Sequence, residues 1–145
     1  MRVVLDTNVL VAGLLTAAGP PGWIVEAVLA GELEPVFDAA IRQEYEEVLR
    51  QPEFRFPSAR IDDVLAALDR FAFVVAAVAP WPVSLPDRDD EPFLAVAQAS
   101  ASVLVTGNLR HFPLRVRGGV TVLSPGEFVE RLKRPTVDRP SSSLA

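Results

Sequence analysis

Acidic side chains stand at three places along the chain from which they can converge on a metal ion. Asp6 follows a short apolar run at residues 3–5, and four acids crowd positions 87–91. Glu44 lies at the edge of the apolar arc of a helix expected over residues 39–50, counting about 100° per residue. Capping a helix needs one or two acids, so the run at 87–91 exceeds that need. A bound divalent cation would offset the repulsion among these carboxylates.

Each of these acids also has a simpler interpretation. An isolated aspartate at the end of a strand often only shapes a turn, and acids are favoured at any helix N-terminus. The sequence says more about which metal could bind than about whether a metal binds. The chain has no cysteine and a single histidine, His111, which excludes thiolate sites and His-rich zinc sites. A metal would therefore be held by oxygen ligands, as Mg²⁺ or Mn²⁺ are.

The elements that must position these acids alternate along the chain. Apolar runs predict short strands at residues 3–5, 35–37, 73–78, 103–105 and 120–123. Helical spacing of apolar residues predicts helices at 23–30, 39–50, 59–71, 91–100 and 125–132. Asp38 and Ser58 are the expected N-caps of two of them. This alternation favours a three-layer α/β/α domain with a mostly parallel central sheet and helices on both faces.

In a parallel sheet, the residues that come directly after each strand lie at the same edge of the sheet, and ligand sites lie at this edge. Asp6 follows the first strand, while Thr106 and Asn108 follow the strand at 103–105. We therefore expect these three side chains to meet the acids at 87–91.

Composition sets the remaining bounds. The chain has 145 residues and is interpreted as one domain over 1–134, with a proline- and serine-rich tail at 135–145 that we expect to be disordered. Asp6 and Asn8 interrupt the N-terminal apolar stretch, so we do not interpret it as a signal peptide and expect a cytoplasmic protein without a membrane span. The net charge of −5 argues mildly against nucleic-acid binding. The segment "RHFPLRVR" is either a phosphate-contacting face or a solvated loop.

Four stretches together resemble the PIN-domain family, in particular its branch of VapC-type toxins from toxin–antitoxin systems. They are "VLDTNVLVAGLL", "IRQEYEEVL", "DRDDEPFLAVAQASASVLVTGN" and "HFP…GVTVLSPGEFVERL". The resemblance covers residues 2–133 and implies a Mg²⁺- or Mn²⁺-dependent ribonuclease. It also implies a cognate antitoxin as partner and a homodimer. The apolar helices at 23–30 and 61–73 are candidate surfaces for either partner, although burial in the core explains the same residues.

The resemblance also assigns roles to individual residues. The metal ligands of the family correspond to Asp6, Glu44 and Asp90, with Asp87 or Asp89 in support. In such a site the metal activates water for attack on phosphorus, so no nucleophilic side chain is required. Thr7 and Thr106 could orient the water or a phosphate oxygen. Arg110 and His111 are candidates for RNA contacts, while His111 beside Phe112 could equally be structural.

The family often has Asp where this chain has Asn108. Because Asn offers one neutral oxygen in place of a charged carboxylate, we expect weaker binding of a second metal.

Three other interpretations remain beside the toxin. A catalytically weak or inactive binding module with the same fold would lack metal-dependent cleavage, and a housekeeping RNA-processing nuclease would lack an antitoxin. An aspartate-nucleophile phosphatase or a receiver domain fits less well. The phosphatase needs a second Asp where Asn8 stands. The receiver needs a strand-end Lys, and the single lysine is Lys133 in the last helix.

Overall fold

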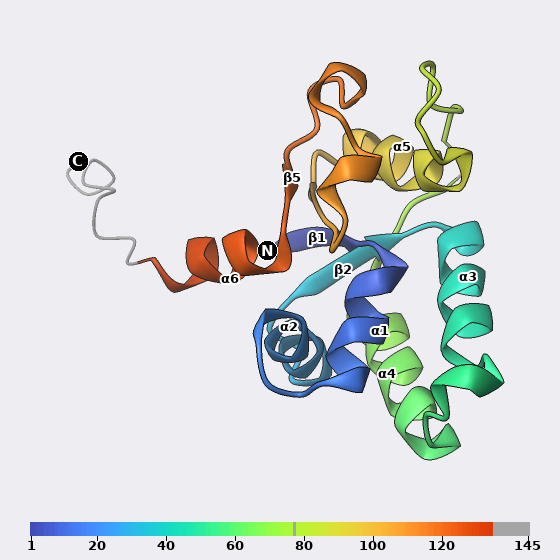
Figure 1. Cartoon of the computed structure of the whole chain (residues 1–145), viewed down its shortest axis with the longest axis vertical. Coiled ribbons are helices and arrows are strands. Elements are labelled where there is room, and N and C mark those ends of the chain that lie inside the picture. The colour runs from blue at the N-terminus through green and yellow to red at the C-terminus, as the bar shows by residue number, and fades with distance from the viewer. Residues whose placement is uncertain (77, 135–145) are drawn as a thin grey trace.

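The computed structural model describes residues 1–76 and 78–134 and contains one central sheet of five strands (Figure 1). The strands are β1 (Arg2–Leu5), β2 (Glu34–Phe37), β3 (Phe73–Val74), β4 (Val103–Val105) and β5 (Val122–Leu123). They lie in the order β3-β2-β1-β4-β5, and every neighbouring pair is parallel. The predicted α/β fold with a parallel sheet is therefore confirmed, and all carboxyl ends of the strands meet at one edge.

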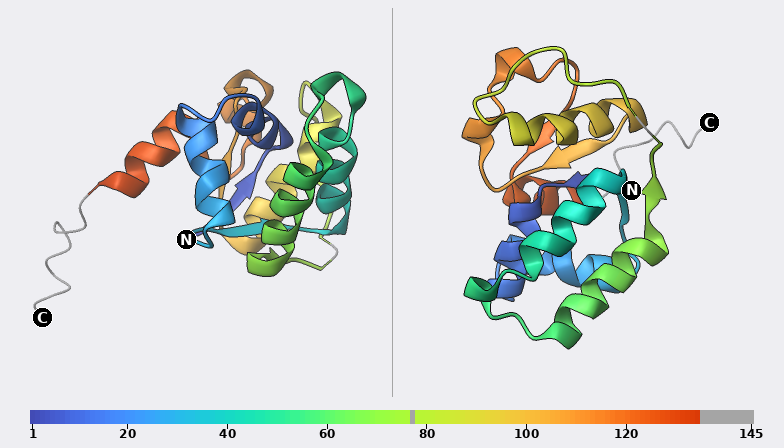
Figure 2. Two further views of the ribbon diagram at one scale, coloured as in Figure 1. Left: turned by 90° about the horizontal axis from the view of Figure 1, so that it is seen from below. Right: turned by 90° about the vertical axis from the view of Figure 1, so that its right-hand side faces the viewer.

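Helices cover both faces of this sheet, as predicted. They are α1 (Thr7–Leu15), α2 (Pro20–Leu29), α3 (Ala39–Leu49), α4 (Ser58–Phe71), α5 (Glu91–Ser100) and α6 (Pro125–Lys133). Helix α5 lies on one face, and α1 to α4 gather on the other (Figures 1 and 2). Helix α6 packs against α2 at the side of the molecule. The short 3₁₀ helices are η1 (Pro52–Phe54), η2 (Arg88–Asp90), η3 (Leu109–His111) and η4 (Leu114–Val116).

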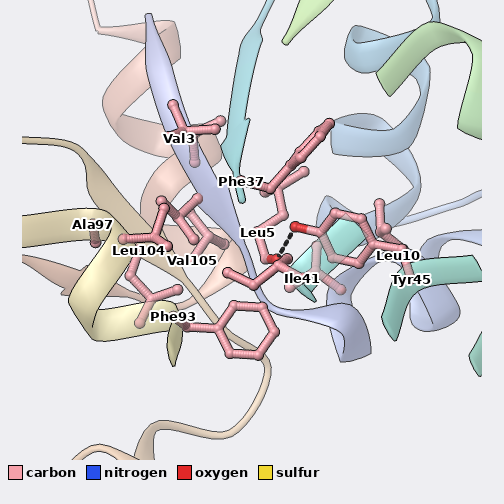
Figure 3. Packing of buried hydrophobic residues seen from close by; sticks show 14 of the residues in the cluster. Val3, Leu5, Leu10, Phe37, Ile41, Tyr45, Phe93, Ala97, Leu104 and Val105 are labelled. Atoms are coloured by element: carbon pink, nitrogen blue, oxygen red, sulfur yellow. Dashed lines mark hydrogen bonds between the residues drawn. The ribbon is translucent and has the colours of Figure 1, made fainter. Parts of the chain in front are cut away.

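The core lies on both sides of β1, the central strand. Leu104 of β4 and Phe93 of α5 are both buried and belong to the part of the core on the α5 face (Figure 3). On the other face Phe37 and Tyr45 meet edge to face, with ring centroids 5.9 Å apart. The Tyr45 hydroxyl donates a hydrogen bond of 2.5 Å to the carbonyl oxygen of Leu5. This bond joins α3 to the end of β1, directly before Asp6.

Several predicted boundaries were wrong. Helix α1 was not predicted, because "DTN" interrupts the apolar run, yet the carbonyl of Asp6 accepts the first helical hydrogen bond, from Val9 N at 2.9 Å. Helix α2 begins three residues earlier than predicted, at Pro20, since proline suits the first helical position. Ser58 is not an N-cap: Pro57 takes that place and Ser58 is the first helical residue. The capping role of Asp38 is confirmed by its side chain, which accepts from Ile41 N at 2.9 Å.

The two outer strands are shorter than predicted, β3 ending at Val74 and β5 beginning at Val122. Both are edge strands, so each has a neighbour on one side only, and β3 is exposed along its length.

The structure also bears on the expected partner surface at 23–30 and on the expected absence of a membrane span. Of the helix predicted at 23–30, the apolar residues Ile24, Val25 and Val28 are buried in the core, while Trp23 is 36% exposed. Within the described ranges no single helix is long and apolar enough to cross a membrane. The pair α1 and α2 meets that test only when taken together, with a bend of 100° between them. The tail predicted at 135–145 lies outside the described residues.

Candidate functional site

Strand β1 delivers Asp6 to the carboxyl edge of the sheet. Its backbone N–H donates to the carbonyl oxygen of Val105 at 2.9 Å, which continues the pairing of β1 with β4. The Asp6 side chain is only 5% exposed, and its Oδ2 accepts a hydrogen bond of 2.8 Å from the hydroxyl of the fully buried Thr106. The two residues predicted to meet at the strand ends are thus in direct contact.

The segment after β4 is held against the start of α1 by Asn8. Its amide Nδ2 donates to Asp6 Oδ2 at 3.3 Å, and its Oδ1 accepts from the backbone N–H of Gly107 at 2.9 Å. One residue further on, the backbone N–H of Asn108 donates to Thr106 Oγ1 at 3.0 Å. A single network therefore fixes Asp6, Thr106 and the backbone of Asn108 relative to one another.

Glu44 reaches the same region from α3. The side chain is half-buried, as its position on the helix predicted, and one carboxylate oxygen accepts a hydrogen bond from the Thr7 hydroxyl. Burial raises the pKa of Glu44, and the negative charges of Asp6, Asp89 and Asp87 raise it further. Acids from α3, from β1 and from the segment before α5 therefore act on one another electrostatically.

Asp90 completes the group at the junction of η2 and α5. It is 9% exposed, and its Oδ2 lies 2.9 Å from Nδ1 of His111. Burial, followed by the charges of Asp6 and Asp87, raises the pKa of Asp90 to about 6. Ligand atoms of Asp87, Asp90 and His111 all lie within 4.8 Å of one another, a spacing that one metal ion can bridge.

The donor set fits a hard divalent cation. Asp87 and Asp90 of the close group offer carboxylate oxygens, the ligands that Mg²⁺ and Mn²⁺ prefer, and Asp6 and Glu44 add two more carboxylates nearby. Burial is also the largest cause of the raised pKa of Asp6, because a carboxylate with little solvent around it is less stable in its ionised form. A divalent cation would offset the crowding of these carboxylates directly. His111 suits a second role, since carboxylate ligands are commonly oriented by a hydrogen bond from a neighbouring group.

The structure thus brings together most residues that the sequence singled out. Asp6, Glu44, Asp87, Asp90, Thr106 and Asn108 lie around the carboxyl ends of β1 and β4. Arg110 belongs to η3 beside His111, is exposed, and forms no ion pair within the described part of the chain. A cavity of about 920 Å³ lies elsewhere, between α2 and α6, and none of these site residues lines it.

Two contacts had no signal in the sequence. His111, considered as an RNA contact or as structural, pairs with Asp90, and Thr7 bonds Glu44 across a separation of 37 residues. Both contacts depend on where η3 and α3 lie in space, which spacing along the chain does not reveal.

The fold and this acidic edge define the class of the protein. The family described as the PIN domain matches residues 2–110, which is three quarters of the chain. The chain belongs to the PIN domain family, as its sequence motifs predicted.

Two individual proteins extend this comparison. An uncharacterized protein of Methanocaldococcus jannaschii is 26% identical, with a match that covers 92% of this chain and 93% of that protein. The crystal structure of VapBC2 from Rickettsia felis, bound to a DNA fragment from their promoter, includes a chain of similar structure. The match has a TM-score of 0.54 at 12% identity and covers 86% of this chain and 98% of that one. At such low identity the likeness concerns the fold alone.

Proposed function

We propose that this chain is a metal-dependent endoribonuclease that hydrolyses RNA phosphodiesters with Mg²⁺ or Mn²⁺ held by Asp6, Glu44 and Asp90, with Asp87 in support. The observation that carries this proposal is the crowding of buried Asp6 and Asp90 with half-buried Glu44 at the carboxyl edge of a PIN-domain sheet, where each of the three carboxyls has a raised pKa. Membership of the PIN domain family supports it. When bound, the metal would supply an activated water and would neutralise phosphate charge.

The protein's own residues then have positioning tasks. The Thr106 hydroxyl holds Asp6, the Thr7 hydroxyl holds Glu44, and His111 holds Asp90. Arg110, exposed beside His111, is suited to contact the RNA backbone, since a guanidinium matches phosphate geometry. No nucleophilic side chain is needed for hydrolysis by water.

We further propose that the nuclease is the toxin of a toxin–antitoxin pair and acts in the cytoplasm as a homodimer. The resemblance of its motifs to VapC-type toxins supports this assignment, and the fold shared with a chain of the VapBC2 structure is compatible with it. Co-expression with the product of any small adjacent gene, followed by purification and light scattering, tests both the partner and the dimer. A monomer that captures no such product would contradict this part of the proposal.

The nuclease itself is tested on a mixed pool of structured and single-stranded RNAs, incubated with Mn²⁺ or with EDTA. We expect cutting with Mn²⁺ and none with EDTA. Cutting that persists in EDTA would overturn metal dependence, and no cutting under any metal would favour a binding module.

That second candidate, a weak or inactive binding module, is favoured by one observation. Asn108 stands in the turn fixed by Thr106, where an Asp would add a charged ligand. We predict that Asn108→Asp raises Mn²⁺ affinity and increases RNA cleavage at limiting Mn²⁺ by about tenfold. Isothermal titration calorimetry and initial cleavage rates measure these effects. Equal affinity and equal rates in the two proteins would show that position 108 does not contribute to the metal site.

The raised pKa of Asp90 predicts a dependence of the site on pH. Its folded value of about 6 exceeds the ordinary 3.8, so the folded state holds the proton more tightly than the unfolded state. Without metal, this group favours folding below pH 4, and the benefit is lost as the pH rises through 6. Protons and metal compete for the same carboxylate, so Mn²⁺ affinity rises between pH 5 and pH 7.

Thermal melts of the wild type and of Asp90→Asn between pH 4 and pH 7.5, with and without Mn²⁺, measure this effect. We expect the stability of the metal-free wild type relative to Asp90→Asn to fall as the pH rises. Mn²⁺ should raise the melting temperature of the wild type most at pH 7. A difference between the two proteins that does not change with pH would contradict the assignment.

A further inference from the structure

A cavity of about 400 Å³ opens beside the acidic site at the same edge of the sheet. Asp38 and Ala40 line it from the start of α3, and residues 78–81 line it from the segment after β3. Asp38 follows β2 directly, and β2 and β3 are the strands next to β1 on one side. The cavity therefore lies by the carboxyl ends of β2 and β3, while Asp6 lies at that of β1.

The third wall of the cavity is continuous with the acidic site itself. Arg88, Glu91 and Ala95 line it from η2 and α5. Arg88 stands between two of the site's acids in the sequence, and Glu91 directly follows Asp90. None of the site's acids lines the cavity itself, so a molecule that fills it lies beside the acidic site, with Arg88 and Glu91 between the two.

The lining has the chemistry of a binding site for a largely apolar group that carries a charge at one end. Most of the wall is apolar, contributed by Val78, Ala79, Pro80, Trp81, Pro92 and Ala95. The charged residues are few, namely Asp38, Arg88 and Glu91, a combination typical of ligand pockets. Among the described residues, exposed Arg88 forms no ion pair, although Asp87 and Asp89 flank it. Its guanidinium is available to a phosphate.

The wall formed by residues 78–90 is anchored at two points. The indole Nε1 of Trp81 donates to the carbonyl oxygen of Val116 at 2.9 Å, which fastens the segment to η4. The backbone N–H of Leu85 donates to Glu91 Oε2 at 3.0 Å, which fastens it to the start of α5. Trp81 and Leu85 are themselves buried. The cavity is therefore formed by anchored walls before any ligand arrives.

We propose that this cavity receives one unpaired base of the RNA, next to the phosphate that is cut, and that Arg88 contacts the phosphate of that nucleotide. The proposal rests on the ribonuclease function proposed above and narrows its substrate to single-stranded RNA. A base that is stacked and paired in a duplex cannot enter such a cavity, whereas an unstacked base can pack against apolar walls. The base bound here sets a sequence preference at one position beside the cut.

The test fills the cavity and compares the result with a matched change elsewhere. Ala40→Leu places three extra carbons in the cavity, whereas Ala66→Leu makes the same change at an exposed position of α4. Arg88→Ala removes the phosphate contact, with exposed Arg70→Ala as its control. Each protein is assayed with Mn²⁺ on a labelled single-stranded RNA library with randomised positions around the cut, and on a duplex of the same sequence. Binding to both RNAs is measured by fluorescence anisotropy in EDTA.

We expect the wild type to cut and bind the single strand at least tenfold better than the duplex, with a base preference at one position. Ala40→Leu should lose that preference and cut about tenfold more slowly, while Ala66→Leu should match the wild type. Arg88→Ala should weaken binding. The slope of the logarithm of the binding constant against the logarithm of the salt concentration should fall by about the amount that one phosphate contact contributes. Arg70→Ala should leave both unchanged.

Two outcomes would overturn the proposal in different ways. A wild type that cuts RNA, while Ala40→Leu retains its rate and base preference, contradicts the base cavity and leaves the nuclease intact. A wild type that neither cuts nor binds single-stranded RNA removes the nuclease proposal and this one with it.

Discussion

Asp6→Asn is expected to abolish metal-dependent RNA cleavage without weakening the fold. Asp6 acts on both other main acids, because its charge raises the pKa of Glu44 and of Asp90. Loss of an orienting partner alone typically lowers metal affinity or activity by 10–100-fold. Loss of the ligand itself should therefore reduce single-turnover cleavage by at least about 100-fold.

Asp6→Asn should also change the thermal stability of the protein, in a direction that depends on whether metal is bound. Burial raises the pKa of Asp6, so its ionised form opposes folding at neutral pH when no metal is present. The amide side chain that Asp6→Asn introduces would carry no charge and could still accept the hydrogen bond from Thr106. We expect the metal-free variant to melt at or above the temperature of the wild type at pH 7, and to lose the rise that Mn²⁺ gives the wild type.

An exposed aspartate of α4 gives the matched control. Asp63→Asn makes the same chemical change on the surface, where Asp63 forms no ion pair within the described residues. It should cleave RNA and respond to Mn²⁺ like the wild type. Cleavage by Asp6→Asn at the wild-type rate would remove Asp6 from the site. Unfolding of this variant would instead show that Asp6 is needed for the structure.

The largest effect on stability is expected from Phe93→Ala. Phe93 is 1% exposed and belongs to the core cluster on the face where α5 packs against the sheet (Figure 3). Removing a buried phenyl ring costs about 3–5 kcal/mol through lost burial and the cavity that remains. Domains of this size have a free energy of unfolding of about 5–15 kcal/mol, so the variant would be marginal. Because α5 begins directly after Asp90, cleavage should also fall.

Urea denaturation followed by circular dichroism measures this loss. Leu114→Ala is the control, because Leu114 is 79% exposed and its truncation should change stability by less than about 0.5 kcal/mol. A loss below about 1 kcal/mol for Phe93→Ala would mean that α5 is not packed on the sheet as described.

The polar residues Asp6, Thr7 and Asn8 show why one part of the fold was predictable and another was not. The run before them is β-branched and apolar, which suffices for a buried strand. The helix that follows was missed because its first residues are polar for reasons outside the segment. Thr7 bonds Glu44 of α3, and Asn8 bonds Gly107 after β4. Spacing within a segment carries no information about such distant partners.

The site residues also divide into those that the sequence could predict and those that it could not. The rule that parallel strands end at one edge was enough to bring Asp6, Thr106 and the acids at 87–91 together. Helical geometry put Glu44 only at the rim of a buried helix face, because a helix face is a local property, and its role as a ligand came from the family resemblance. The contact of His111 with Asp90 was not, since it depends on how η3 turns back after β4. The cavity beside Arg88 was equally hidden, because three separate segments form its walls.

The measurement that tests the central claim most directly follows metal binding and cleavage together. Mn²⁺ is titrated into the wild-type protein at pH 7, bound metal is counted by electron paramagnetic resonance, and the cleavage rate of single-stranded RNA is recorded at each point. If the acids at the carboxyl edge form the catalytic metal site, the two curves coincide, and both disappear in Asp6→Asn. Metal that binds without any cleavage, or cleavage that proceeds before metal binds, would contradict the account.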